Sequence, residues 1–137
     1  MTKEEKQQLL LKDLSARWQY GVKIKDLSSQ ADTIIDVLGI KGHFVLVDEY
    51  NRFGNIYDSI SIEYVKPYLR SMSNMTKEEE EELRLLKNQL VDCDENNEIK
   101  FYSIIDEIHK LYLSHHIDFM GLIPKGLAIE ATQNIYN

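Results

Sequence analysis

The sequence has little cysteine and proline and no long apolar run, and these shortages exclude several classes of protein. Its single cysteine, Cys93, cannot form an intramolecular disulfide, which makes a reducing, cytoplasmic setting the default. No apolar run reaches the roughly 18 residues that suggest a membrane-spanning helix. The first residues carry charges on both sides of three leucines, which is not the pattern of a signal peptide. We therefore expect a cytoplasmic protein with no membrane contact.

The motifs of common enzymes are also missing. There is no phosphate-binding loop, no glycine-rich dinucleotide fingerprint, no H-E-x-x-H and no G-x-S-x-G. The sequence therefore predicts no catalytic residue and no cofactor, and it favours a non-catalytic protein.

Charge is distributed unevenly along the chain. Residues 1–70 contain 10 Lys/Arg and 10 Asp/Glu, whereas residues 71–137 contain 6 and 13 and account for the whole net charge of −7. An acidic surface repels phosphate backbones, so the second half is a poor candidate for binding nucleic acid. The neutral first half leaves nucleic-acid binding open.

The first 70 residues are predicted to form a helix followed by short strands. A helix is expected from Thr2 to about Trp18, with Leu11 and Leu14 on the same face as Trp18 and an end at Gly21. Alternating or β-branched apolar residues then predict four or five strands within residues 20–25, 33–38, 43–47 and 56–65. Pro67 should end the last of these near Val65.

The second half of the chain is predicted to form two helices followed by a C-terminal tail. Thr76 and Glu79 fit a capping box at the start of a helix over 75–90, in which Glu80 is expected to pair with Arg84. A more amphipathic helix over 101–116 should carry His115 on its apolar face, and the apolar tail should pack back onto the core.

These elements predict an α+β fold with two regions. Residues 1–70 form an N-terminal helix and a small antiparallel β-unit, either an SH3-like barrel or a curved sheet with one covered face. Residues 71–137 form an acidic helical region packed against it, and the whole is expected to be one compact unit.

Residues 92–103, between the two predicted helices, resemble a calcium loop. Asp92, Asp94 and Asn96 stand at the first, third and fifth ligand positions. However, Asn97 replaces the glycine of the sharp turn, and Ser103 stands where a bidentate glutamate is needed. A solvated acidic loop is therefore favoured over a metal site, with a calcium- or metal-dependent function as an alternative.

Aromatic and basic residues in and after the β-unit are the candidates for an interaction surface. Small β-units bind peptides or bases on such surfaces, although core packing explains many such rings. The candidates are Tyr50, Arg52, Phe53, Tyr57 and Tyr68. A protein partner is favoured, and binding of nucleic acid through the β-unit, assisted by Lys23 and Lys25, is the alternative.

Three blocks of sequence resemble a family of short uncharacterised proteins. LLLKDLSARWQYGVKIK lies near the start, SIEYVKPYLRSMSNMTKEEEEEL in the middle and HHIDFMGLIPKGLAIEA near the end. That family occurs in gut Bacteroidetes and in their phages and mobile elements. The chain departs from it at Trp18-Gln19 and at Ser71. The resemblance implies a cytoplasmic bacterial protein, with an accessory role in a phage or mobile element, and supplies no site residues.

Overall fold

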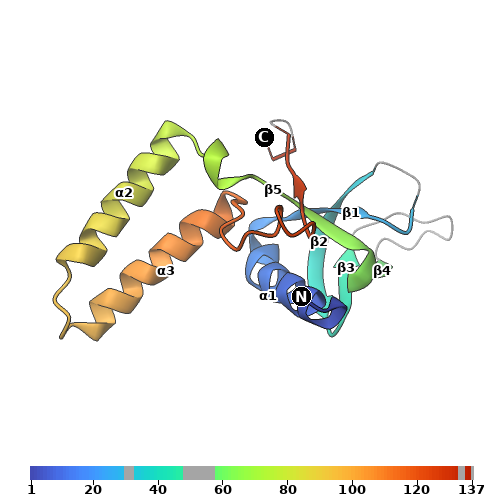
Figure 1. The fold of residues 1–137 in the computed structure, drawn as a ribbon, viewed down its shortest axis with the longest axis horizontal. Coiled ribbons are helices and arrows are strands. Elements are labelled where there is room, and N and C mark those ends of the chain that lie inside the picture. The colour runs from blue at the N-terminus through green and yellow to red at the C-terminus, as the bar shows by residue number, and fades with distance from the viewer. Residues whose placement is uncertain (30–32, 48–57, 133–134, 137) are drawn as a thin grey trace.

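The computed structural model describes residues 1–29, 33–47, 58–132 and 135–136, and these ranges form an α+β fold (Figure 1). An N-terminal helix precedes the β-unit, and two helices follow it, which confirms the predicted order. The helices are α1 (Lys3–Arg17), α2 (Lys77–Asp92) and α3 (Glu98–Ser114). The strands are β1 (Lys23–Asp26), β2 (Ile34–Lys41), β3 (Phe44–Val47), β4 (Asp58–Ser61), β5 (Val65–Leu69) and β6 (Ile129–Glu130).

The strands form one open sheet in the order β4-β3-β2-β1-β5-β6. Neighbouring strands are antiparallel except β5 and β6, which are parallel. Of the two predicted arrangements, the described strands adopt the sheet and do not close into a barrel. A barrel would close only if the outer edge of β5 paired with β4, the strand at the other end of the sheet. The C-terminal β6 occupies that edge of β5 instead.

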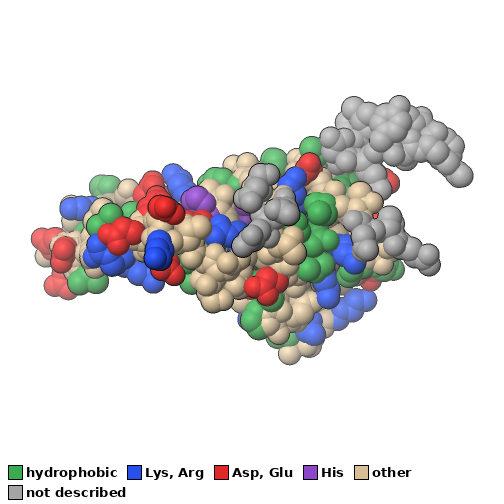
Figure 2. Space-filling model, turned by 90° about the horizontal axis from the view of Figure 1, so that it is seen from above, with side chains coloured by type: hydrophobic (Ala, Val, Ile, Leu, Met, Phe, Trp, Pro, Cys, Tyr) green, Lys and Arg blue, Asp and Glu red, His purple; other side chains and the backbone are tan. Residues whose placement is uncertain are grey.

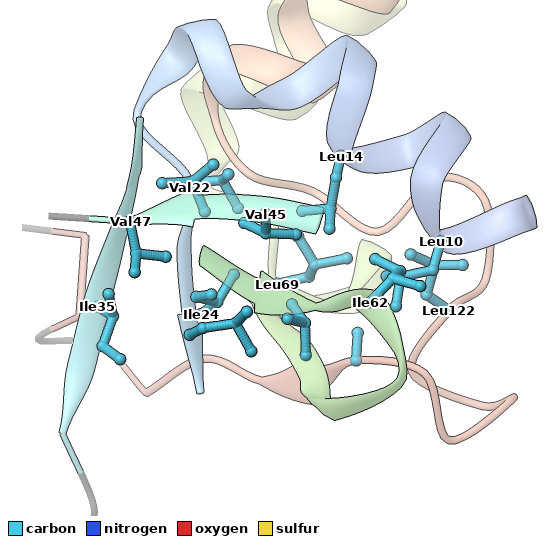
Figure 3. Close-up of a cluster of buried hydrophobic side chains, with 14 residues drawn as sticks. Leu10, Leu14, Val22, Ile24, Ile35, Val45, Val47, Ile62, Leu69 and Leu122 are labelled. Carbon is cyan, nitrogen blue, oxygen red and sulfur yellow. The ribbon is translucent and has the colours of Figure 1, made fainter. Parts of the chain in front are cut away.

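The main core lies between α1 and one face of this sheet. Buried and exposed residues alternate along β2, so one face of the strand points into the protein. Leu14 reaches from α1 toward Val45 of β3, and Leu10 lies beside Ile62 and Leu122 (Figure 3). Thr2 begins α1 by accepting a hydrogen bond from the Glu5 N–H at 3.1 Å, and Gly21, at φ 83°, follows the 3₁₀ turn after it.

The strand expected to end near Val65 begins there instead. Residues 62–64 form a 3₁₀ turn, and β5 contains Pro67. Backbone polar groups alternate between the two edges of a strand, so Pro67 faces the same edge as Leu69, whose carbonyl accepts the Ala131 N–H at 2.7 Å. Because β6 pairs with β5 only from Tyr68 onward, the missing N–H of Pro67 removes no bond to β6.

The helices α2 and α3 form a hairpin that projects from the sheet and α1 (Figure 1). They pack through a second cluster in which Leu83, Leu111, Tyr112 and Ile117 are buried. The predicted capping box of Thr76 and Glu79 is present in full. Arg84 pairs with Glu81 rather than with Glu80, the partner predicted from sequence, so the contact spans three residues instead of four.

The segment after α3 returns to the sheet, as predicted. The Arg70 N–H donates to the His116 carbonyl at 2.7 Å, and the Asp118 N–H donates to the Arg70 carbonyl at 2.8 Å. Leu122 is fully buried in the main core, and Ile123 and Leu127 pack against it. The base of the hairpin is therefore hydrogen-bonded to the end of β5.

Candidate functional site

A cavity of about 400 Å³ lies where the hairpin meets the sheet. Four segments that are far apart in the sequence contribute to it: the end of β5, the start of α2, the end of α3 and the chain after β6. The lining residues are mostly polar and are Arg70, Asn74, Thr76, Ser114, His115, His116, Ala131, Thr132 and Tyr136. In Figure 2, histidine and basic side chains reach the surface between the hairpin and the rest of the protein. We call this the junction cavity.

An ion pair between Arg70 and Glu79 is the centre of one wall. The guanidinium nitrogens Nη1 and Nη2 of Arg70 lie 2.7 and 2.6 Å from the two carboxylate oxygens of Glu79. Arg70 also donates to the Asn74 and His115 carbonyls. The hydrogen bond from Arg70, followed by that from the Thr76 N–H, lowers the pKa of Glu79 from 4.5 to about 2. Glu79 is therefore ionised at neutral pH and fixes α2 to the end of β5.

His115 is oriented by the same carboxylate. Its Nδ1 lies 2.9 Å from Oε2 of Glu79. A nitrogen facing a carboxylate carries a proton, so in the neutral imidazole Nε2 is the acceptor. The prediction that His115 lies in the middle of an apolar helix face is wrong. Because α3 ends at Ser114, His115 is the residue that caps the helix, and its side chain is 43% exposed.

His116 is buried behind His115 in the left-handed conformation, at φ 59°. Its ring stacks on Tyr136, with the ring centroids 3.7 Å apart. The Tyr136 hydroxyl donates to the Tyr68 carbonyl at 2.6 Å and accepts the Lys23 N–H at 2.9 Å. Burial raises the pKa of Tyr136 to about 12, so the phenol stays protonated. These contacts join the chain after β6 to β1 and β5.

A buried ion pair from α1 lies near this wall. Nε and Nη2 of Arg17 donate to the two oxygens of Asp13 at 2.8 and 3.0 Å, and Nη2 also donates to the Ile117 carbonyl. Burial, and then the charge of Arg17, lowers the pKa of His116 from 6.5 to about 4. Nη1 of Arg17 and Nδ1 of His116 are both buried without a hydrogen-bond partner in the described part of the chain. Such atoms are uncommon in folded proteins and mark a region under functional or structural constraint.

The interaction surface predicted from sequence can be placed only in part. Tyr50, Arg52, Phe53 and Tyr57 lie outside the described residues. Tyr68 lies in β5, is partly buried, and its carbonyl binds Tyr136 of the junction cavity wall.

Two lysines of the nucleic-acid alternative, Lys23 and Lys25, lie on β1. The ammonium group of Lys23 lies 2.8 Å from Oδ1 of Asp36, so a neighbouring carboxylate offsets its charge.

The predicted calcium loop does not form as a loop of 12 residues. Asp92 is the last residue of α2, and α3 already begins at Glu98. Asp94 Oδ1 accepts the Asn96 N–H at 2.9 Å, and the Asn97 side chain caps α3. Across residues 1–29, 33–47, 58–132 and 135–136, no group of three or more His, Cys, Asp or Glu side chains is placed to hold a metal ion.

The free end of the hairpin carries a second candidate surface that the sequence patterns did not reveal. Val91, Ile99 and Tyr102 are 83, 87 and 64% exposed. We call these three side chains the tip patch. Carboxylates of the end of α2, the connection and the start of α3 accompany them, namely Asp92, Asp94, Glu95 and Glu98. Figure 2 shows hydrophobic, acidic and basic side chains interspersed at this end of the molecule.

Comparison of the chain with family models, curated proteins and solved structures finds no match. In the part of the chain that is described, no helix has both the length and the apolarity needed to cross a membrane. The resemblance to the Bacteroidetes family accordingly stays a prediction from sequence, and the function is argued from the surfaces above.

Proposed function

We propose that this protein is a non-catalytic interaction module that docks onto a partner protein through the tip patch. The observation that carries the proposal is the exposure of Val91, Ile99 and Tyr102 at the end of a projecting hairpin. Apolar side chains that contribute nothing to the core and gather at an extremity are typical of protein-binding sites. The partner segment would carry apolar side chains flanked by lysine or arginine, because residues 92–98 include four carboxylates and no lysine or arginine.

The sequence supplies the setting of this proposal. The resemblance described above favours a cytoplasmic bacterial protein with an accessory role in a phage or mobile element. The charge of −7 in residues 71–137 supports a protein partner over nucleic acid for the hairpin.

The experiment is capture of the partner from native bacterial lysate by the tagged protein, compared with the triple variant Val91→Ser/Ile99→Ser/Tyr102→Ser. We expect the wild type to retain a stoichiometric protein after nuclease treatment. The variant should bind that protein at least about tenfold more weakly, since a few apolar or aromatic anchor residues supply most of the binding energy of an interface. Its melting temperature should stay close to that of the wild type because the three side chains are exposed.

The matched control is the double variant Leu38→Ser/Phe44→Ser. It removes two exposed apolar side chains from the sheet, far from the hairpin tip. This variant should bind the captured protein as the wild type does. Equal binding by the tip variant, loss of binding only in the sheet variant, or partners that disappear with nuclease would each contradict the proposal.

A further inference from the structure

A groove of about 290 Å³ lies between the first turns of α1 and the 3₁₀ turn that leads into β5. Its floor consists of apolar side chains, namely Leu10, Leu27, Ile62, Val65 and Leu127. Three of these belong to the main core, but Leu27 is 44% exposed and Leu127 is only partly buried. The groove therefore offers apolar surface that its own chain leaves in contact with solvent.

The charged residues that line this groove are mostly basic, and we call it the lysine groove. They are Lys3, Lys6, Lys66 and Glu63. Glu63 accepts a hydrogen bond from Lys3 at 3.2 Å, so these two charges offset each other. In the described ranges of the chain, neither Lys6 nor Lys66 has a carboxylate as an ion-pair partner. The groove thus combines an apolar floor with positive charge at its edge.

The tip patch has the complementary character. Its three apolar side chains are exposed, and residues 92–98 beside them carry four exposed carboxylates. An apolar tip with carboxylates matches an apolar groove with lysines in both hydrophobicity and charge. In Figure 1 the free end of the hairpin lies far from the start of α1, so the tip cannot enter the groove of its own chain.

We propose that the partner of the tip patch is a second copy of this chain, whose lysine groove receives the apolar side chains of the tip. Lys6 and Lys66 of that copy pair with the carboxylates of residues 92–98. This inference rests on the proposed function, because the tip patch is the docking element in both. The contact joins two different surfaces, so each bound copy still has a tip or a groove for a further copy, and the assembly grows into rings or open chains.

The first measurement is sedimentation velocity of the purified full chain over about a hundredfold range of concentration. We expect the average mass to rise above that of the monomer as the concentration increases. The rise should be smaller at about 0.5 M salt than at about 0.05 M, because salt screens exposed charges.

The variant Lys6→Glu/Lys66→Glu reverses the charge of the groove. We expect its association constant to fall at least about tenfold, since it places carboxylates against the carboxylates of the tip. The second substitution puts an acid opposite Lys25 in the register of β1 and β5, an arrangement that does not weaken a sheet. The matched control is Lys12→Glu/Lys41→Glu, which reverses two exposed lysines outside the groove and should associate as the wild type does.

A charge swap tests whether the two surfaces meet each other. The tip variant Asp92→Lys/Glu95→Lys should lose self-association as the groove variant does. An equimolar mixture of the two variants should associate again, because the acidic tip of one then meets the native groove of the other. Loss of folding in either variant would not be repaired by mixing, so the mixture separates loss of charge pairing from loss of structure.

The inference is overturned if the wild type stays monomeric, if the groove variant associates as the wild type does, or if the mixture of variants stays dissociated. Capture of a different protein from lysate through the tip patch, with a pure chain that stays monomeric, would also overturn it and leave the proposed function intact. Self-association that is lost in the groove variant but kept in Val91→Ser/Ile99→Ser/Tyr102→Ser would contradict the role of the tip patch itself.

Discussion

Replacing Asp13 with leucine is expected to lower the free energy of unfolding by about 3–5 kcal/mol. Asp13 and Arg17 are both fully buried and form a two-pronged ion pair on α1. Without the carboxylate, the guanidinium of Arg17 stays in the core with its charge uncompensated. The measurement is urea denaturation of the wild type and Asp13→Leu at neutral pH.

The double variant Asp13→Leu/Arg17→Met separates a buried charge from ordinary packing loss. Removing both charges leaves two apolar side chains of similar size, so at least half of the lost stability should return. Recovery is incomplete because the Ile117 carbonyl loses one of its two donors, Arg17, and keeps only the Phe119 N–H. A double variant as unstable as Asp13→Leu would show that the cost does not come from the unpaired charge.

An exposed ion pair provides the matched comparison. Arg84 and Glu81 on α2 are both more than half exposed. Glu81→Gln should leave the urea midpoint close to that of the wild type, because solvent screens such pairs. If it cost as much as Asp13→Leu, burial would not be the reason for the predicted difference.

The buried ion pair of Asp13 and Arg17 has a recognisable spacing in the sequence. Leu10, Asp13, Leu14 and Arg17 are spaced three and four residues apart, so they occupy one face of α1. The apolar pattern of the helix names only Leu11, Leu14 and Trp18, yet an acid and a base four residues apart can also enter a core together. Local signals were only partly reliable: the capping box of Thr76 and Glu79 is confirmed, whereas Arg84 pairs with Glu81 and not with the predicted Glu80.

The junction cavity could not be predicted from sequence periodicity or from local motifs. Tyr136 contacts Lys23 across 113 positions, and Arg70 contacts His115 across 45. No periodicity links residues at these separations, because their approach depends on β6 joining the sheet beside β5. The two histidines after α3 show that periodicity also fails over a few residues once a helix has ended. Once α3 ends at Ser114, the helical rotation no longer tells which way His115 and His116 point.

Between pH 7 and pH 5, the largest pH effect on stability is expected from His116. Its pKa is about 4 in the folded protein and 6.5 for the ordinary side chain. As the pH falls below 6.5, the unfolded chain binds a proton that the folded chain rejects, so stability is present above that pH and is lost down to about pH 4. From pH 7 to pH 5 the wild type should lose about 2 kcal/mol from this residue alone.

The variant His116→Asn tests this assignment. Asparagine tolerates the left-handed conformation that His116 adopts at φ 59°, and it does not titrate. Its stability at pH 7 should be lower because the stacking on Tyr136 is lost. Between pH 7 and pH 5, however, its free energy of unfolding should fall by about 2 kcal/mol less than that of the wild type.

The interval from pH 7 to pH 5 is chosen because the contribution of Glu79 to stability changes only at lower pH. The pKa of Glu79 is lowered from 4.5 to about 2, so its contribution to stability is complete above pH 4.5 and is lost only as the pH falls toward 2. The two residues therefore destabilise the fold in successive pH ranges. Parallel stability curves for the wild type and His116→Asn above pH 5 would mean that His116 accepts a proton in the folded state. Burial of His116 would then not be enough to keep its imidazole neutral in the folded protein.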